Sequence, residues 1–393
     1  MRRLLRHLRP DDPAEIPSSD DGEPVAGAGT RSGKVWIFYP FEIFTVVTLA
    51  ASVVFLRLHD LRIDWRTVEY TLYPMVPLLP KALLGGLGLQ VVYRLVTRKP
   101  LRAYLRQVAS VPWAVLWLRM WIAAMLMTYL YFWVKISVPL INDRLWDRQL
   151  WSLDVALHLG LSPSVFVSQA FRGSPLLGLL DRWYGLWVTT VFYTMAFFSA
   201  MPGELVRRRF MSSCVFLWTL GAWIYMAVPA LGPIYAFPQV WHDLLDEMPR
   251  ARAAQIALWE NYQRILAGRT GGLRRFNPTL GVAAMPSLHV GAHWLFALWS
   301  RRRARVLFVP FVIATLLTLI GSILTGWHYA VDAYVGILLA WLCFRLSVVT
   351  ERGDLAVDRT PESPEALESV DLTPAETSPS GGSVPGSSRS PGA

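Results

Sequence analysis

Two short segments of the sequence contain the residues best suited to chemistry. The segment MPSLHVG carries His289, and the segment GWHYAVD carries His328 and Asp332. His328 and Asp332 are four residues apart, so on a helix they would share one face. A carboxylate beside one imidazole nitrogen fixes the tautomer and leaves the other nitrogen free to attack an electrophile. The spacing alone is equally compatible with a buried hydrogen-bonded pair.

The residues before His289 suggest an anion site. Pro286 and Ser287 stand where a helix should begin, because proline suits a first helical turn. Backbone N–H groups at a helix start, together with the Ser287 hydroxyl, can receive an anion. A second histidine at such a site can act as general acid for a leaving oxygen. The set predicts phosphoryl transfer with a histidine nucleophile.

A metal site is the competing interpretation. His293 follows His289 by one helical turn, and with His328 and Asp332 it could complete a set of ligands. A zincin-type site would need a glutamate directly after the first histidine, and Val290 occupies that position. We therefore expect phosphohistidine chemistry without a metal or other cofactor.

The composition predicts an integral membrane protein of all-α class. The chain has 393 residues, of which 53% are hydrophobic and 13% aromatic. The net charge of +10 comes from basic residues clustered between apolar runs, a pattern of membrane topology and not of nucleic-acid binding. Eight runs approach the ~20 apolar residues that cross a bilayer: 36–57, 74–97, 112–135, 183–202, 210–229, 281–299, 305–325 and 329–349. The second of these predicted spans, 74–97, contains Pro77, Pro80 and Lys81 and could be re-entrant.

Arginine clusters predict the orientation in the membrane. The clusters at 207–209 and 301–305 should both be cytoplasmic, which places both histidines on the extracytoplasmic face of a multi-pass cell-membrane protein. Both termini are then cytoplasmic. Residues 143–160 and 250–267 read as amphipathic helices lying on the membrane or as solvated surface helices, and the second could form a lid over the site.

The expected domain organisation has four parts. Residues 1–34 and 351–393 are polar and rich in Pro, Gly and Ser, so we expect disordered cytoplasmic segments there. Residues 35–110 would form a two-span extension, and residues 111–350 would form the catalytic transmembrane core.

The segments MPSLHVG and HYAVDAYVG resemble the second and third signature motifs of the type 2 phosphatidic acid phosphatase superfamily. The resemblance covers roughly residues 140 to 350. It implies a core of six helices, here the third to eighth spans, and chemistry that needs no metal. It also implies that His328 is the nucleophile, that Asp332 orients it and that His289 protonates the leaving group.

Two departures from the phosphatase pattern bear on the reaction. Phosphatases of the superfamily have a first motif of Lys, six residues and Arg-Pro, and this sequence contains no such string. Their third motif begins with Ser-Arg seven residues before the histidine, where this chain has Gly321 and Ser322. The pattern is more similar to the inositol phosphorylceramide synthase branch, which transfers a head-group phosphate between lipids.

A phosphoryl group still needs cationic donors. The stretch before the catalytic segment offers Arg269, Arg274 and Arg275 for the phosphate or head group, although a solvated loop would contain the same residues.

The sequence thus predicts an integral membrane phosphotransferase. It would act on a lipid phosphate or phosphodiester, and its acceptor would be the hydroxyl of a lipid, a sugar or water. Its other partners would be membrane lipids, with no nucleic acid. A lipid phosphate phosphatase is the first alternative. A non-enzymatic transporter or scaffold that uses an intramembrane charge pair is the second.

Overall fold

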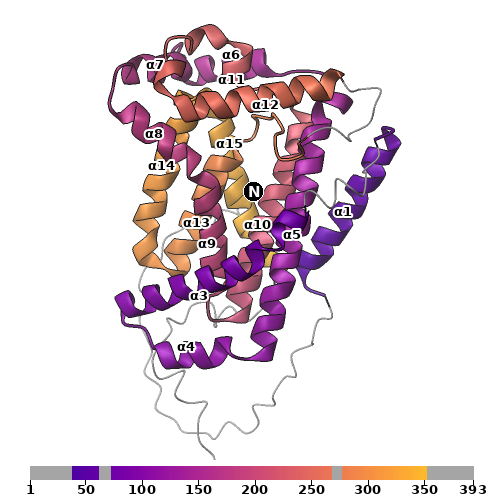
Figure 1. The fold of residues 1–393 in the computed structure, drawn as a ribbon, viewed down its shortest axis with the longest axis vertical. Coiled ribbons are helices and arrows are strands. Elements are labelled where there is room, and N and C mark those ends of the chain that lie inside the picture. The colour runs from indigo at the N-terminus through magenta and orange to yellow at the C-terminus, as the bar shows by residue number, and fades with distance from the viewer. Residues whose placement is uncertain (1–37, 62–71, 268–276, 352–393) are drawn as a thin grey trace, which may run out of the picture. The chain divides into compact units, whose positions relative to one another are not determined.

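The computed structural model describes residues 38–61, 72–267 and 277–351, and its regular elements in these ranges are helices (Figure 1). Short 3-10 turns at Tyr73–Met75, Pro238–Val240, Leu245–Glu247 and Arg305–Leu307 join some of them. The all-α prediction is confirmed. The α-helices are α1 (Pro40–Leu58), α3 (Leu78–Thr97), α4 (Leu101–Val108), α5 (Val111–Ile141), α6 (Asp147–Leu157), α7 (Pro163–Phe171), α8 (Leu176–Gly185), α9 (Trp187–Ser199), α10 (Glu204–Ala227), α11 (Pro233–Ala236), α12 (Pro249–Ala267), α13 (Leu288–Arg303), α14 (Phe308–Leu324) and α15 (Ala330–Thr350).

Six described helical segments are long and apolar enough to cross a membrane, which confirms a multi-pass membrane protein. They are α1, α5, α10 and α15, together with α3 and α14 extended by the turns before them. The runs expected to span at 183–202 and 281–299 form α9 and α13, which have only 13 and 16 residues. The α13 helix begins late because Pro286 has no N–H to donate and Ser287 caps the helix, accepting from the N–H of Val290 at 3.5 Å.

The core of the bundle is built around α10. This helix packs against α5 and α15, and α13 lies against α14 and α15. Phe210 of α10 meets Phe296 and Trp299 of α13, with ring centroids 6.2 and 5.9 Å apart. The indole N–H of Trp299 donates to the hydroxyl of Ser213 at 2.9 Å, so this large side chain is buried with its polar atom satisfied.

The helices α1 and α3 lie at the periphery of the bundle. Only 22% and 17% of their apolar windows are buried in the protein, against 78% for α10, so most of their surface is left for lipid. Glu42 of α1 pairs with Arg119 of α5 at 2.6 Å. Gln90 of α3 donates to the carbonyl of Phe197 in α9 at 2.9 Å. Figure 1 shows α3 running obliquely across the lower part of the bundle.

The histidines and the arginine clusters occupy opposite ends of the bundle. His289 lies in the first turn of α13, and Arg301, Arg302 and Arg303 lie in its last turn. Glu351 lies at the end of α15 that is far from His328. Its carboxylate accepts a hydrogen bond from the hydroxyl of Ser212 in α10 at 2.8 Å. The helices α6, α7, α11 and α12 gather at the histidine end (Figure 1). These two ends are the ones that the arginine pattern assigned to different sides.

Candidate active site

The three predicted reactive side chains meet where α13 and α15 begin. Nε2 of His328 is 3.2 Å from Nδ1 of His289, and Nδ1 of His328 is 3.4 Å from a carboxylate oxygen of Asp332. The side chains of His328 and Asp332 are 3% and 0% exposed. One nitrogen of His328 therefore faces the carboxylate and the other faces the second histidine, as a nucleophile between an orienting acid and a proton donor requires.

Two glycines allow α13 and α15 to approach so closely. A Cβ added at Gly336 would lie 2.3 Å from the carbonyl oxygen of Ser287, and one added at Gly291 would lie 2.8 Å from the carbonyl oxygen of Gly336. The N–H of Ser287 donates to the carbonyl of Asp332 at 2.9 Å, which ties the two helix starts together. The N–H of Tyr329 donates to the Asp332 carboxylate at 2.9 Å. Backbone contacts thus set the spacing of the two histidines.

Two buried carboxylates of α6 hold the segment that follows His328. Asp154 accepts from the N–H groups of Ala330 and Val331 at 2.8 and 2.7 Å, at the positive end of α15. Asp147 accepts from the hydroxyl of Tyr329 at 2.9 Å. Burial raises the pKa of both carboxyls, and their hydrogen-bond donors lower it in part. Asp154 thus holds the first turn of α15, and Asp147 links Tyr329 to the backbone of Leu231 and Gly232.

Aromatic side chains enclose His289. The Tyr184 ring stacks on it with centroids 5.0 Å apart, and the Trp187 ring lies 4.1 Å away at a tilt. Trp187 also donates from its indole N–H to the His289 carbonyl at 3.3 Å. The Tyr184 hydroxyl and the Trp327 indole N–H are buried without a hydrogen-bond partner among the described residues. Both therefore have unused hydrogen-bonding capacity beside the histidines.

The histidines line a large apolar chamber between α3, α5 and α9. Its cavity volume is 620 Å³, and Lys135 of α5 is the one lysine or arginine among the described residues that line it. The ammonium of Lys135 lies 5.5 Å from the ring centroids of both Tyr131 and Tyr225. No carboxylate pairs with Lys135 in the described part of the chain. The chamber thus combines lipid-like walls, one cation and the two histidines.

The other predicted binding residues are placed differently. Ser287 is fully buried as the cap of α13 and does not line the chamber. Arg269, Arg274 and Arg275 lie outside the described residues, so their role stays a proposal.

Among the described residues, His293 does not join a group of side chains that could bind a metal. It lies with Nδ1 3.1 Å from the His289 carbonyl and 3.3 Å from the Thr318 hydroxyl. Among the described residues, no three His, Cys, Asp or Glu side chains are grouped so that they could hold a metal ion. His293 thus contacts the backbone of the first turn of α13 through its Nδ1 atom.

Sequence reasoning missed Lys135, although two signals could have found it. An ionisable side chain within an apolar span usually has a purpose. Lys135 is also followed by six residues and then Asn142 and Asp143, where the phosphatases of the superfamily have Arg-Pro. The position of Lys135 relative to Asn142 and Asp143 is thus similar to that of the lysine in this motif, although the arginine and proline are absent.

These features define a polytopic membrane helix bundle with a histidine pair and a carboxylate at one end. The profile of the PAP2 superfamily matches residues 148–346, half of the chain, and the chain belongs to this superfamily. The matched range contains His289, His328 and Asp332 but not Lys135. Neither a curated protein nor a solved structure matches the sequence. Membership of this superfamily is consistent with an enzyme that acts on lipids as a phosphatase or a phosphotransferase.

Proposed function

We propose that this protein is a lipid phosphotransferase that carries the phosphoryl group on Nε2 of His328. The observation that carries the proposal is the position of that nitrogen. It faces Nδ1 of His289 at 3.2 Å on the wall of the apolar chamber, while the other imidazole nitrogen faces Asp332. A lipid phosphate in the chamber would present its phosphorus to His328 with its chains against apolar side chains.

The reaction would proceed in two balanced steps. In the first, Nε2 of His328 forms a bond to phosphorus, the bond from phosphorus to the lipid oxygen breaks, and His289 gives that oxygen a proton. In the second, an acceptor hydroxyl gives its proton to His289 and attacks phosphorus, and the bond to Nε2 breaks. Asp332 stabilises the positive charge that His328 carries in the intermediate.

The His289 ring has to move when the donor binds. A separation of 3.2 Å leaves no space for a phosphorus atom between the two nitrogens. Rotation of the imidazole towards the chamber, which has a volume of 620 Å³, would open that space and keep His289 within reach of the leaving oxygen.

Three groups on the chamber wall could bind the phosphate oxygens. Lys135 supplies a positive charge, and the Tyr184 hydroxyl and Trp327 indole N–H supply donors with no other partner among the described residues. We propose Lys135 as the main cation of the site. The three predicted arginines near residue 270 would act in addition to it, while Ser287 would act only as the cap of α13.

We infer that the site faces the extracytoplasmic side and that the transfer is similar to that of inositol phosphorylceramide synthases. The positive-inside pattern supports the sidedness, since the arginine clusters lie at the opposite end of the bundle. The missing phosphatase arginine at Ser322 supports transfer over hydrolysis. A transporter is less well supported, because the histidines lie at helix starts and not midway along the spans.

Covalent labelling tests the phosphohistidine directly. The purified full chain in detergent would be incubated with 32P-labelled phosphatidate or 32P-labelled phosphatidylinositol and quenched in base, where phosphohistidine survives. We expect label on the wild type and none on His328→Ala. We also expect inhibition by vanadate and no loss of labelling in EDTA. Label that persists in His328→Ala would refute the assignment, and loss in EDTA would support metal chemistry.

Substitution of Lys135 tests the proposed cation. A hydrogen bond to a charged group contributes about 1.5–3 kcal/mol, so Lys135→Met should slow labelling by roughly 10- to 150-fold. Lys135→Arg should retain part of the rate. The matched control is Lys81→Met, since Lys81 is an exposed lysine of α3 that does not line the chamber. Equal rates for Lys135→Met and Lys81→Met would remove Lys135 from the site.

A further inference from the structure

The chamber beside the histidines extends a long way along α5. Lys135, Tyr131, Thr128, Ala124 and Trp121 line it at intervals of three or four residues, so they form one stripe of the helix. Fourteen positions separate Lys135 from Trp121, which at 1.5 Å per residue gives a stripe about 21 Å long. The hydrocarbon of one bilayer leaflet is only about 15 Å thick. The chamber is therefore deep enough to contain a hydrocarbon chain along its length.

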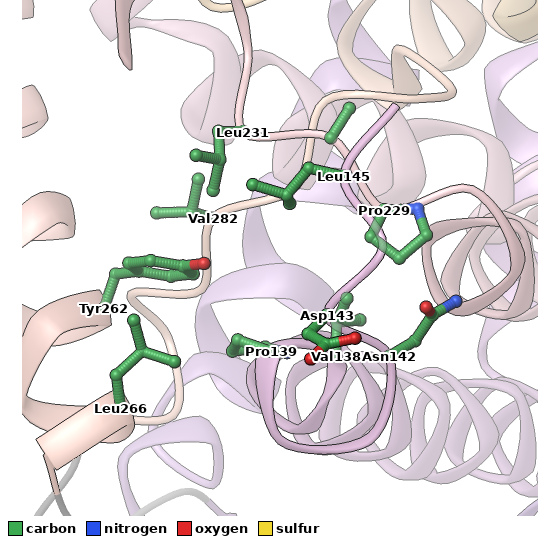
Figure 2. Close-up of a pocket in the computed structure, with 11 residues that line it drawn as sticks. Val138, Pro139, Asn142, Asp143, Leu145, Pro229, Leu231, Tyr262, Leu266 and Val282 are labelled. Carbon is green, nitrogen blue, oxygen red and sulfur yellow. The ribbon is translucent and has the colours of Figure 1, made fainter. Parts of the chain in front are cut away.

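The polar surroundings at the histidine end favour one direction for such a chain. A smaller cavity of 190 Å³ adjoins the chamber there, and Leu231 and Val282 line both. Figure 2 shows the Asp143 carboxylate and the Asn142 amide across this small cavity from Leu231. Hydrocarbon packed against a carboxylate takes water away from its charge, which is unfavourable. A chain attached to a phosphate at His328 is therefore directed along the α5 stripe, towards Trp121.

Trp121 closes the far end of the stripe and is held firmly in place. Its indole N–H donates to the hydroxyl of Ser199 in α9 at 3.1 Å. Its ring packs edge-on against Phe192, with centroids 5.6 Å apart, and the Trp117 ring lies 5.8 Å from it, one turn further along α5. Trp121 lines the chamber, whereas Trp117 does not. Because one hydrogen bond and two ring contacts fix this indole, it forms a rigid floor.

The wall of the chamber is open to lipid in one part and closed in another. Leu78 at the start of α3 and Val188 at the start of α9 line the chamber and are 37% and 67% exposed, so a lipid can enter there. Near Met195, which also lines the chamber, α3 and α9 are in backbone contact: a Cβ added at Gly86 would lie 2.4 Å from the carbonyl oxygen of Ala196. This contact leaves no space for a chain to leave between the two helices, so the chain end stays above the Trp121 floor.

We propose that Trp121 sets the longest hydrocarbon chain that the chamber accepts, which makes it a specificity-determining residue. The proposal deepens the phosphotransferase function argued above and rests on it for the phosphate end of the ligand. Bonds of about 1.5 Å at angles near 111° advance an extended chain by about 1.25 Å per atom, so the stripe of about 21 Å accepts roughly 17 chain atoms. A longer chain has to fold back or draw the phosphate away from His328. Trp121 lies outside residues 148–346, the range that the superfamily profile matches, so this limit is a feature of the present chain.

A series of single-chain ligands tests the length limit. The n-alkyl phosphonates from decyl to docosyl have a P–C bond where the proposed reaction would break a P–O bond, so they bind without reacting. Each would be added to the full chain at one mole fraction in detergent micelles, where the chains are already in apolar surroundings and length alone gains little affinity. The two measurements are competition against 32P-phosphatidate labelling of His328 and the rise in melting temperature, which requires binding only. We expect similar affinities from dodecyl to hexadecyl and about tenfold weaker binding by eicosyl phosphonate, equivalent to about 1.4 kcal/mol.

Two substitutions should move the limit in opposite directions. Trp121→Ala removes the floor, so eicosyl phosphonate should regain most of the tenfold loss. Ala124→Phe places a ring in the chamber three residues nearer the histidines, about 4.5 Å or roughly four chain atoms, so hexadecyl phosphonate should now bind about tenfold more weakly than dodecyl. The matched controls are Ile122→Ala and Ile122→Phe, since Ile122 follows Trp121, is 46% exposed and does not line the chamber. Both controls should keep the wild-type profile.

Several results would overturn the proposal. A wild-type profile with no drop between hexadecyl and eicosyl phosphonate removes the limit, and a drop at the same length in Trp121→Ala or in Ala124→Phe removes Trp121 as its cause. A profile that moves equally in the Ile122 variants also contradicts the assignment. Failure of the phosphotransferase is separate, because absence of label on wild-type His328 refutes the reaction while the melting temperatures still report the length limit.

Discussion

The close approach of α13 and α15 makes Gly336 a sensitive position for the proposed chemistry. A Cβ at residue 336 would lie 2.3 Å from the carbonyl oxygen of Ser287, whereas ordinary contacts begin near 3.4 Å. Gly336→Ala therefore has to push the two helix starts apart by about 1 Å. Those two starts carry His289 and His328, so their 3.2 Å nitrogen pair would be separated by a similar amount.

The expected magnitudes follow from this displacement. Overpacking in a close-packed interior costs about 1–3 kcal/mol, and alanine recovers about 0.5–1 kcal/mol relative to glycine in a helix. The net loss should lower the melting temperature by a few degrees. A misplacement of about 1 Å in a catalytic set can reduce the rate on the order of a hundredfold, so labelling of His328 should suffer more than stability.

The matched control is Gly88→Ala, because an added Cβ at Gly88 in α3 meets no atom within 4 Å. This variant should gain helix propensity, melt at or slightly above the wild-type temperature and label normally. Thermal melting in detergent and the rate of His328 labelling would be measured for both variants. A Gly336→Ala protein that labels at the rate of Gly88→Ala would refute the inference that this helix contact positions the histidines.

Two further predictions concern the residues that hold the surrounding segments. Burial raises the pKa of Asp154 more than its two backbone donors lower it, so the native chain keeps this proton to higher pH than the unfolded chain does. The free energy of unfolding should then fall as the pH rises from about 4 through the native pKa of Asp154, and it should stay level above that pH. Asp154→Asn should flatten this part of the profile, as measured by thermal melting between about pH 4 and pH 8. An unchanged slope in this variant would contradict the assignment. Asp181 accepts hydrogen bonds from the N–H groups of Arg250 and Ala251 at the start of α12, at 3.2 and 2.8 Å. Asp181→Ala should therefore destabilise the start of this helix by about 1 kcal/mol, which would appear as faster hydrogen exchange in its first turn than in the wild type. Equal exchange in the two proteins would contradict a capping role for Asp181.

The grouping of His289, His328 and Asp332 could be predicted from their residue types and local spacing. His328 and Asp332 are one helical turn apart, and the proline and serine before His289 mark the start of a helix. The charge pattern then predicted that both histidines lie on one face of the membrane, and in the structure their imidazoles lie 3.2 Å apart at one end of the bundle. Each of these inferences uses only neighbours in the sequence or the alternation of apolar and basic segments.

The supporting residues could not be predicted, because their partners are far away in the sequence. Asp147 meets Tyr329 across 182 residues, and Asp154 meets Ala330 across 176. Nothing in the amphipathic pattern of α6 shows which of its polar side chains turn inwards. Lys135 likewise contributes only if its side of α5 faces the chamber, which depends on how α5, α9 and α13 pack. The two short helices α9 and α13 were expected to be longer, because hydropathy does not register where a cap begins a helix.

The charge of the chamber bears on the choice between donors. A phosphomonoester carries between one and two negative charges at neutral pH, whereas a diester carries one. Lys135 is the one lysine or arginine that lines the chamber in the described ranges. Where the phosphatase motif has its arginine, Ser322 is fully buried, with its hydroxyl donating to the Leu319 carbonyl at 2.8 Å. The neighbouring donors are the uncharged Tyr184 and Trp327, which can bind oxygen atoms without adding positive charge. The one cation and the neutral donors that the described residues supply balance a diester better than a monoester, and this balance supports the proposed transfer of a head-group phosphate over removal of a terminal one.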